Sequence, residues 1–172
     1  MGLRAVTDTI AVTELGRTLE FTFDDALRYA GPGSPAGVAV AFKALQRAFA
    51  VLSPDAPPER RTAAVRTAFR GPGARDCFEA VTRALTDDRY VVDRSLLRPD
   101  RGRLLEDFVF EVSIGERSTT LLLREGFVTD EFIDLARAQD RTTERERRFD
   151  DLKAQLARQV LAAPADAVFD IA

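Results

Sequence analysis

Two Gly-Pro-Gly segments, at residues 31–33 and 71–73, divide this chain into its main parts. Each segment ends the element before it, because proline lacks a backbone donor and glycine adopts conformations that other residues avoid. Each is followed by apolar residues at helical spacing, which predicts a helix directly after each break. The fold must therefore contain two helices whose starts are bordered by glycine.

The first of these helices is predicted from Ser34 to about Leu52. Ser34 is a suitable N-cap and Pro35 a suitable first helical residue. One apolar stripe then follows the three- and four-residue spacing of a helix: Val38, Ala41, Phe42, Leu45, Ala48, Phe49 and Leu52. Because Val40 and Val51 widen this stripe, we expect the helix to lie at the centre of the fold.

Alternation of apolar and polar residues predicts the strands. The clearest case is residues 107–114, followed by Gly115-Glu116 as a two-residue turn and by a returning strand through residue 123. Shorter strands are predicted at 64–69 and 90–92. The order helix, strand, helix and three strands argues for an α+β fold with a mixed sheet, helices on one face and extra C-terminal helices.

A length of 172 residues fits one domain, which we divide into three parts. Residues 1–18 are expected to be an N-terminal extension, 19–125 the α+β core and 126–172 a helical segment. The last helix is expected to begin with a capping box formed by Thr143 and Glu146. Its apolar stripe can pack on the core or on a dimer partner, since both would bury the same side chains.

The residue types that are missing exclude several kinds of chemistry. The chain has no histidine and one cysteine, Cys77. It therefore cannot form an intrachain disulfide, a zinc site of Cys and His ligands, or a nucleophile activated by histidine. We assign no catalytic residue, no metal ligand and no cofactor.

The balance of charge limits the partners. The 25 basic and 28 acidic residues give a net charge of −3 and are interspersed, so nucleic acid is not an expected partner. No stretch is expected to reach the roughly 18 apolar residues of a membrane span. Residues 1–9 lack the apolar core of a signal peptide. These features predict a cytoplasmic protein without a membrane partner.

The two glycine-bordered helix starts suggest one binding site. Helix N-termini present free N–H groups and the positive end of a dipole, and glycine lets a ligand approach. If both starts open into one cleft, they would bind a small anion, with Arg70 as a further cation. The alternative is that both breaks are only turns. The candidate ligand-binding residues are Tyr29, Gly31, Gly33, Ser34, Arg70, Gly73, Asp76 and Cys77.

Residues 23–37 resemble the start of the formylmethanofuran dehydrogenase E-like family. That family has a short acidic helix, an aromatic residue, the motif His-Gly-His-x-Cys-Pro-Gly and a long apolar helix. Here Tyr29 takes the place of the aromatic residue. The specified positions of the motif correspond, in order, to Ala30, Gly31, Pro32, Ser34, Pro35 and Ala36, with Gly33 at the unspecified position. The family's later motif, Cys-Gly-x-Asp-Ala, is similar to the segment that begins at Asp76 and Cys77.

The resemblance, over about residues 19–125, implies a fold grouped with the C-terminal domain of glyceraldehyde-3-phosphate dehydrogenase, and a homodimer. It does not carry over the metal, because Ala30 and Pro32 take the two histidine places and Ser34 takes a cysteine place. At the later motif, Asp76 takes the cysteine place. The implication is a non-catalytic relative that keeps the pocket without the metal.

Two other functions remain open from the residues. Asp76 and Glu79, with Asp25, could hold a hard cation such as Mg²⁺ in an enzyme, although acids near a helix start are also favoured by the helix dipole. The C-terminal helix could instead dock a partner, as in a homodimeric interaction module.

Cys77 could be a reactive thiol if it lies in the first turn of a helix, or an ordinary buried cysteine.

Overall fold

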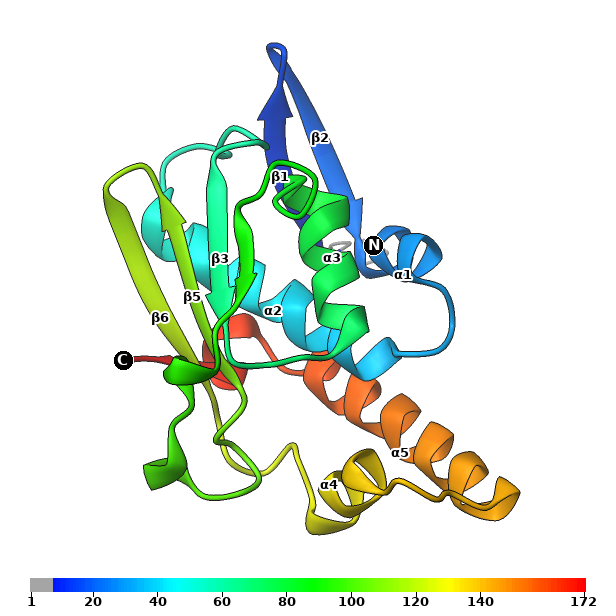
Figure 1. Ribbon diagram of the computed structural model, residues 1–172. Coiled ribbons are helices and arrows are strands. Elements are labelled where there is room, and N and C mark those ends of the chain that lie inside the picture. Colours follow the sequence, from blue (N-terminus) through cyan, green and yellow to red (C-terminus); the bar gives the residue numbers. More distant parts are fainter. Residues whose placement is uncertain (1–7) are drawn as a thin grey trace, which may run out of the picture.

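The computed structural model describes residues 8–172, which fold into a mixed sheet packed against helices (Figure 1). The main sheet contains, in spatial order, β4 (Tyr90–Val92), β3 (Ala63–Thr67), β5 (Val109–Ile114), β6 (Arg117–Leu123) and β7 (Phe169–Ile171). β3 and β4 are parallel and the other neighbours are antiparallel. The α+β class and the mixed sheet predicted from the sequence are thus confirmed.

The helices follow the predicted order. They are α1 (Phe23–Ala30), α2 (Pro35–Leu52), α3 (Pro72–Thr82), α4 (Asp130–Arg137), α5 (Thr143–Ala162) and the short α6 (Ala165–Val168). Two 3-10 turns, η1 (Arg94–Leu96) and η2 (Pro99–Arg101), lie in the loop between β4 and β5. The parallel pair β3–β4 is joined through α3, which forms a βαβ crossover.

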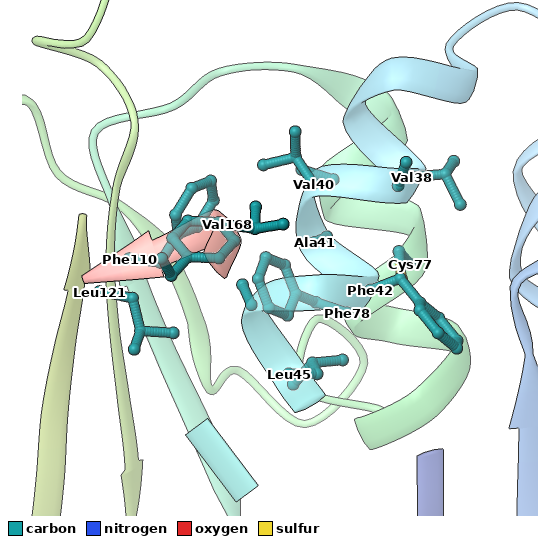
Figure 2. Close-up of a cluster of buried hydrophobic side chains, with 14 of the residues drawn as sticks. Val38, Val40, Ala41, Phe42, Leu45, Cys77, Phe78, Phe110, Leu121 and Val168 are labelled. Carbon is teal, nitrogen blue, oxygen red and sulfur yellow. The ribbon is translucent and has the colours of Figure 1, made fainter. Parts of the chain in front are cut away.

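The core lies between α2, α3 and the inner face of the sheet. Figure 2 shows Phe110 and Leu121 of the sheet facing Val40 and Ala41 of α2, with Phe78 of α3 beside them. Phe78 and Phe110 have ring centroids 5.9 Å apart. α2 is buried on nearly every side, so its predicted central position is confirmed.

α2 corrects the expectation about membrane spans. Within the described residues it is the one helix that is long and apolar enough to cross a membrane, by length and composition alone. However, 72% of it is buried inside the fold, as is usual for a core helix. Its buried Lys43 forms an ion pair with Asp8 at 2.9 Å, which offsets the cost of removing that charge from water.

The region expected to be an N-terminal extension contributes a strand. β1 (Thr9–Glu14) pairs antiparallel with β2 (Arg17–Thr22) across the turn Leu15-Gly16, and Ile10 and Val12 are buried. Ile10 and Val12 alternate with polar or small residues, a pattern typical of a half-buried strand. Residues 1–7 lie outside the described part of the chain.

The C-terminal segment differs from the prediction at the start of α5 and in its last residues. α5 is capped by Thr142, whose side chain accepts a hydrogen bond from Arg145 N, and not by Thr143. The segment does not end in helix: β7 joins the sheet edge beside β6, with Phe169 opposite Leu123. Three residues are too few to show a clear alternation, so the sequence did not reveal this strand.

Candidate functional site

The starts of α2 and α3 meet in space, which is the condition under which the two Gly-Pro-Gly breaks could form one binding site. A Cβ added to Gly73 would lie 2.4 Å from the carbonyl oxygen of Ser34. A Cβ added to Gly37 would lie 3.0 Å from Ala74 N. The backbones of the two first turns therefore touch, and glycine at residues 37 and 73 is what allows this approach.

A cavity of about 710 Å³ opens at this contact, and we call it the helix-start pocket. Its residues on the core side include Ser34, Gly37, Phe69, Arg70, Gly71, Gly73, Arg94, Glu106, Asp107 and Phe108. The C-terminal segment adds Phe132, Ile133, Ala136, Arg137, Arg141, Phe149 and Lys153. Figure 1 shows the arrangement that produces it, with α4 packed on the first half of α5 beyond the ends of α2 and α3.

Neither helix start is capped by a side chain. Ser34 occupies the N-cap position of α2, as predicted, but its side chain makes no cap hydrogen bond. Gly71, the N-cap of α3, has no side chain to offer. The first-turn N–H groups of both helices thus lack a side-chain acceptor, and the positive ends of both helix dipoles lie at the pocket.

Basic side chains outnumber acidic ones in the lining of the helix-start pocket. Five lining residues are basic and two are acidic, which leaves three formal positive charges. The whole chain carries −3. Positive charge is therefore concentrated here against the overall balance of the molecule, which favours an anion.

The basic side chains differ in how they are held. Arg137 donates to Glu106 Oε1 at 3.1 Å, and Arg94 lies 2.9 Å from Asp107 Oδ1. Lys153 donates to the carbonyl oxygen of Gly33 at 2.9 Å. Arg70 is exposed, and it forms none of the ion pairs within residues 8–172 that hold Arg94, Arg137 and Lys153. Arg70, and Arg141, which donates to the carbonyl oxygen of Leu135, are thus the lining cations that a ligand could approach without displacing a protein carboxylate.

Three of the eight candidate ligand-binding residues line this pocket: Ser34, Arg70 and Gly73. Gly33 borders it through the carbonyl oxygen that binds Lys153. Gly31 instead ends α1, with a φ of 84° and its N–H bonded to Leu27 O. Tyr29 lies in the last turn of α1, where it is 57% exposed and outside the pocket lining.

Asp76 and Cys77 also lie outside the lining, because α3 starts earlier than expected. Its first residue is Pro72, so Cys77 lies in the second turn and not at the helix start. Cys77 is fully buried among the apolar side chains between α2 and α3 (Figure 2), and this burial raises the pKa of its thiol. Asp76 pairs with Arg75 at 3.0 Å. The reactive-thiol alternative required Cys77 to lie in the first turn of the helix, and this requirement is not met.

Glu79 has a structural partner. This buried carboxylate accepts hydrogen bonds from both the N–H and the hydroxyl of Thr86, and Arg83 lies 3.5 Å away. Burial opposes its charge, but the Thr86 hydrogen bonds and Arg83 leave the pKa of Glu79 below its ordinary value. Within residues 8–172 no group of three His, Cys, Asp or Glu side chains could hold a metal. The hard-cation alternative thus gains no support from the geometry.

The apolar stripe of the C-terminal helix is used inside the chain. Leu152, Leu156 and Val160 are buried, and α5 packs along α2. Packing on the core, one of the two possibilities that the sequence left open, therefore accounts for the burial of this stripe within the chain. The remaining residue of the stripe, Phe149, is half-buried and lines the helix-start pocket.

Sequence reasoning missed the wall that α4 and α5 provide. Phe149 and Lys153 are four residues apart on one helix, so their common face could have been recognised. Arg137 is the last residue of α4 and Arg141 lies in the loop between α4 and α5, where no periodic pattern places them. Compared with known proteins, the chain matches no family model, and no curated protein matches it at a significant level.

Proposed function

We propose that this protein is a binding module that holds a small anionic ligand in the helix-start pocket. The observation that carries the proposal is the excess of positive charge at two touching helix starts, in a chain that is negative as a whole. Free N–H groups at helix starts, helix dipoles and guanidinium groups all favour the same kind of ligand. The volume of about 710 Å³ is ordinary for a small-molecule site.

Each cation would have its own role. Arg70, which has no ion pair among the described residues, would contact the anion first and hold it through two parallel N–H donors. The first-turn N–H groups of α2 and α3 would stabilise the same negative charge from the side of the pocket where the two helices begin. Arg137 and Arg94 already form ion pairs with Glu106 and Asp107. They would therefore mainly hold the lining side chains in position and contribute less to binding the anion.

The proposed function includes the expectation from the family resemblance. We propose that this protein is a relative of the formylmethanofuran dehydrogenase E-like family that lacks the metal ligands and forms a homodimer. The order α2, β3, α3, β4, β5, β6 is the order that this resemblance implies, which supports the relationship. Sedimentation equilibrium tests the dimer, because the expected mass is twice 19.0 kDa. A mass of one chain at micromolar concentration would rule it out.

Ligand binding is tested by thermal stability and calorimetry with a panel of inorganic phosphate, sulfate, dicarboxylates and aromatic carboxylates. An anion present at 100 times its Kd should stabilise the fold by about 2.7 kcal/mol. Arg70→Gln should weaken the best anion by about tenfold, since it removes one charge-assisted contact. Arg17→Gln, an exposed arginine on the β1–β2 hairpin, is the matched control and should change nothing.

The result that overturns the proposal is equally concrete. If no anion in the panel raises the melting temperature or gives heat on titration at millimolar concentration, the pocket does not bind anions. If Arg17→Gln weakens an anion as much as Arg70→Gln does, binding is not located at the helix-start pocket.

A further inference from the structure

Four phenylalanine side chains line the helix-start pocket, in two contacting pairs. Phe69 and Phe108 are stacked, with ring centroids 4.8 Å apart and planes at 29°. Phe132 and Phe149 meet edge to face, with centroids 5.4 Å apart. The first pair belongs to the core and the second to the C-terminal segment, so aromatic surface faces the cavity from both of its sides.

Positive charge lies on the aromatic wall itself. The Arg141 guanidinium is 5.1 Å from the Phe149 ring centroid, and the Lys153 ammonium is 4.6 Å from it. Both distances are within the range of cation–π contacts. A ligand ring that packs beside this wall would therefore meet the two cations that lie over the Phe149 ring, and need not reach a separate polar site.

The size and shape of the lining argue against a bare inorganic ion as the preferred ligand. Phosphate or sulfate would fill a small part of about 710 Å³ and would leave the phenylalanine surface in contact with water. Burying that surface under a ligand is favourable, and rings gain further from edge-to-face and offset contacts with other rings. An aliphatic group gains the first contribution but not the second.

We infer that the ligand of the helix-start pocket is a small aromatic carboxylic acid, built on one ring or two fused rings. Its ring system lies between the Phe69–Phe108 pair and Phe132, and its carboxylate faces Arg141, Lys153 and Arg70. The inference rests on the proposed function and narrows it, because the proposed function requires only an anion.

Calorimetric titration with three matched compound pairs tests the inference. Benzoate and cyclohexanecarboxylate differ in aromaticity, 2-naphthoate and 2-naphthamide differ in charge, and 2-naphthoate and inorganic phosphate differ in the ring. The expected result is that 2-naphthoate binds best, and that each aromatic acid binds at least about tenfold more tightly than its partner in the pair. Equal affinities of benzoate and cyclohexanecarboxylate would overturn the aromatic inference and leave the proposed function intact.

Three other outcomes are decisive in different ways. If no compound binds, the proposed function fails and the inference with it. If 2-naphthamide binds as tightly as 2-naphthoate, the pocket recognises rings without charge, which overturns both statements. Tighter binding of phosphate than of 2-naphthoate would support an anion site and overturn the aromatic one.

Variants locate the ring contacts. Phe69→Leu and Phe132→Leu keep an apolar side chain in half-buried positions but remove the ring. Each should weaken 2-naphthoate at least about fivefold and leave cyclohexanecarboxylate unchanged. Phe21→Leu, on β2 away from the pocket lining, is the control. Unchanged 2-naphthoate affinity in both pocket variants, with native melting curves, would overturn the inference.

Discussion

Gly73 lies so close to Ser34 that a Cβ at residue 73 would be 2.4 Å from the Ser34 carbonyl oxygen. That oxygen also accepts a hydrogen bond from Val38 N and so belongs to the first turn of α2. It cannot move aside without disturbing the helix. The distance between the two helix starts, and hence the pocket beside them, therefore depends on the absence of a side chain at residue 73.

Gly73→Ala is expected to destabilise the fold, because backbone atoms must separate to admit the methyl group. Overpacking of this kind costs about 2 kcal/mol, which corresponds to a fall in Tm of roughly 5 °C for a chain of this size. Gly33→Ala is the control, since nothing lies within 4 Å of its added Cβ. Thermal unfolding of the two variants side by side measures the difference. Equal melting temperatures would show that the close contact is not required.

Glu79→Ala is expected to cost about 2 kcal/mol, because it leaves the Thr86 N–H without its acceptor and removes the anchor of the loop after α3. Urea unfolding at neutral pH measures this loss. Glu125→Ala, an exposed glutamate, should lie within about 0.5 kcal/mol of the parent. A loss at Glu79 no larger than that would contradict the role assigned to this carboxylate.

The Asp93 carboxylate should make stability depend on acid pH. Hydrogen bonds from Ser95, together with the Arg66 guanidinium, lower the pKa of Asp93 to about 2. A folded-state pKa below the unfolded value means that the stabilisation is present above about pH 4. It is lost as the pH falls toward 2. The difference in urea midpoint between the parent and Asp93→Asn should therefore shrink between pH 5 and pH 2. A constant difference would be evidence against this linkage.

The thiol of Cys77 should be unreactive in the folded protein. It is fully buried, and burial raises its pKa, so the nucleophilic thiolate is scarce. Ellman's reagent should label it only after denaturation in urea. Rapid labelling of the native protein, at the rate of a free thiol, would contradict both the burial and the position in the second turn of α3.

Patterns that repeat along the chain were predictable, and contacts between distant segments were not. The stripe from Val38 to Leu52 and the alternation from Phe108 to Ile114 each contain several repeats, and α2 and β5 form where those patterns lie. β7 has only three residues, and it is held by pairing with β6, more than forty residues earlier. No local pattern encodes a partner at that separation.

In the candidate site, too, some residues could be predicted from local patterns and others could not. Proline and glycine at the two breaks indicate that a helix begins near each one, so Ser34 and Gly73 could be proposed as parts of one pocket. Asp76 and Cys77 could not be placed, since an error of one turn in the start of α3 decides whether a side chain lies at the helix start or further along the helix. Phe132 and Arg141 reach the pocket only because α5 packs on α2, which depends on tertiary contacts.

The wall formed by α4 is joined to the core through pairs between partly exposed ions. Arg103 bridges to Asp130 and Asp134, and Arg137 bridges to Glu106. Such pairs contribute little each, and dissolved salt screens them. Added salt would therefore weaken binding in two ways, by shielding the ligand from the cations and by loosening the wall that carries Phe132. Affinity should fall more steeply with ionic strength than the charge of the ligand alone would require.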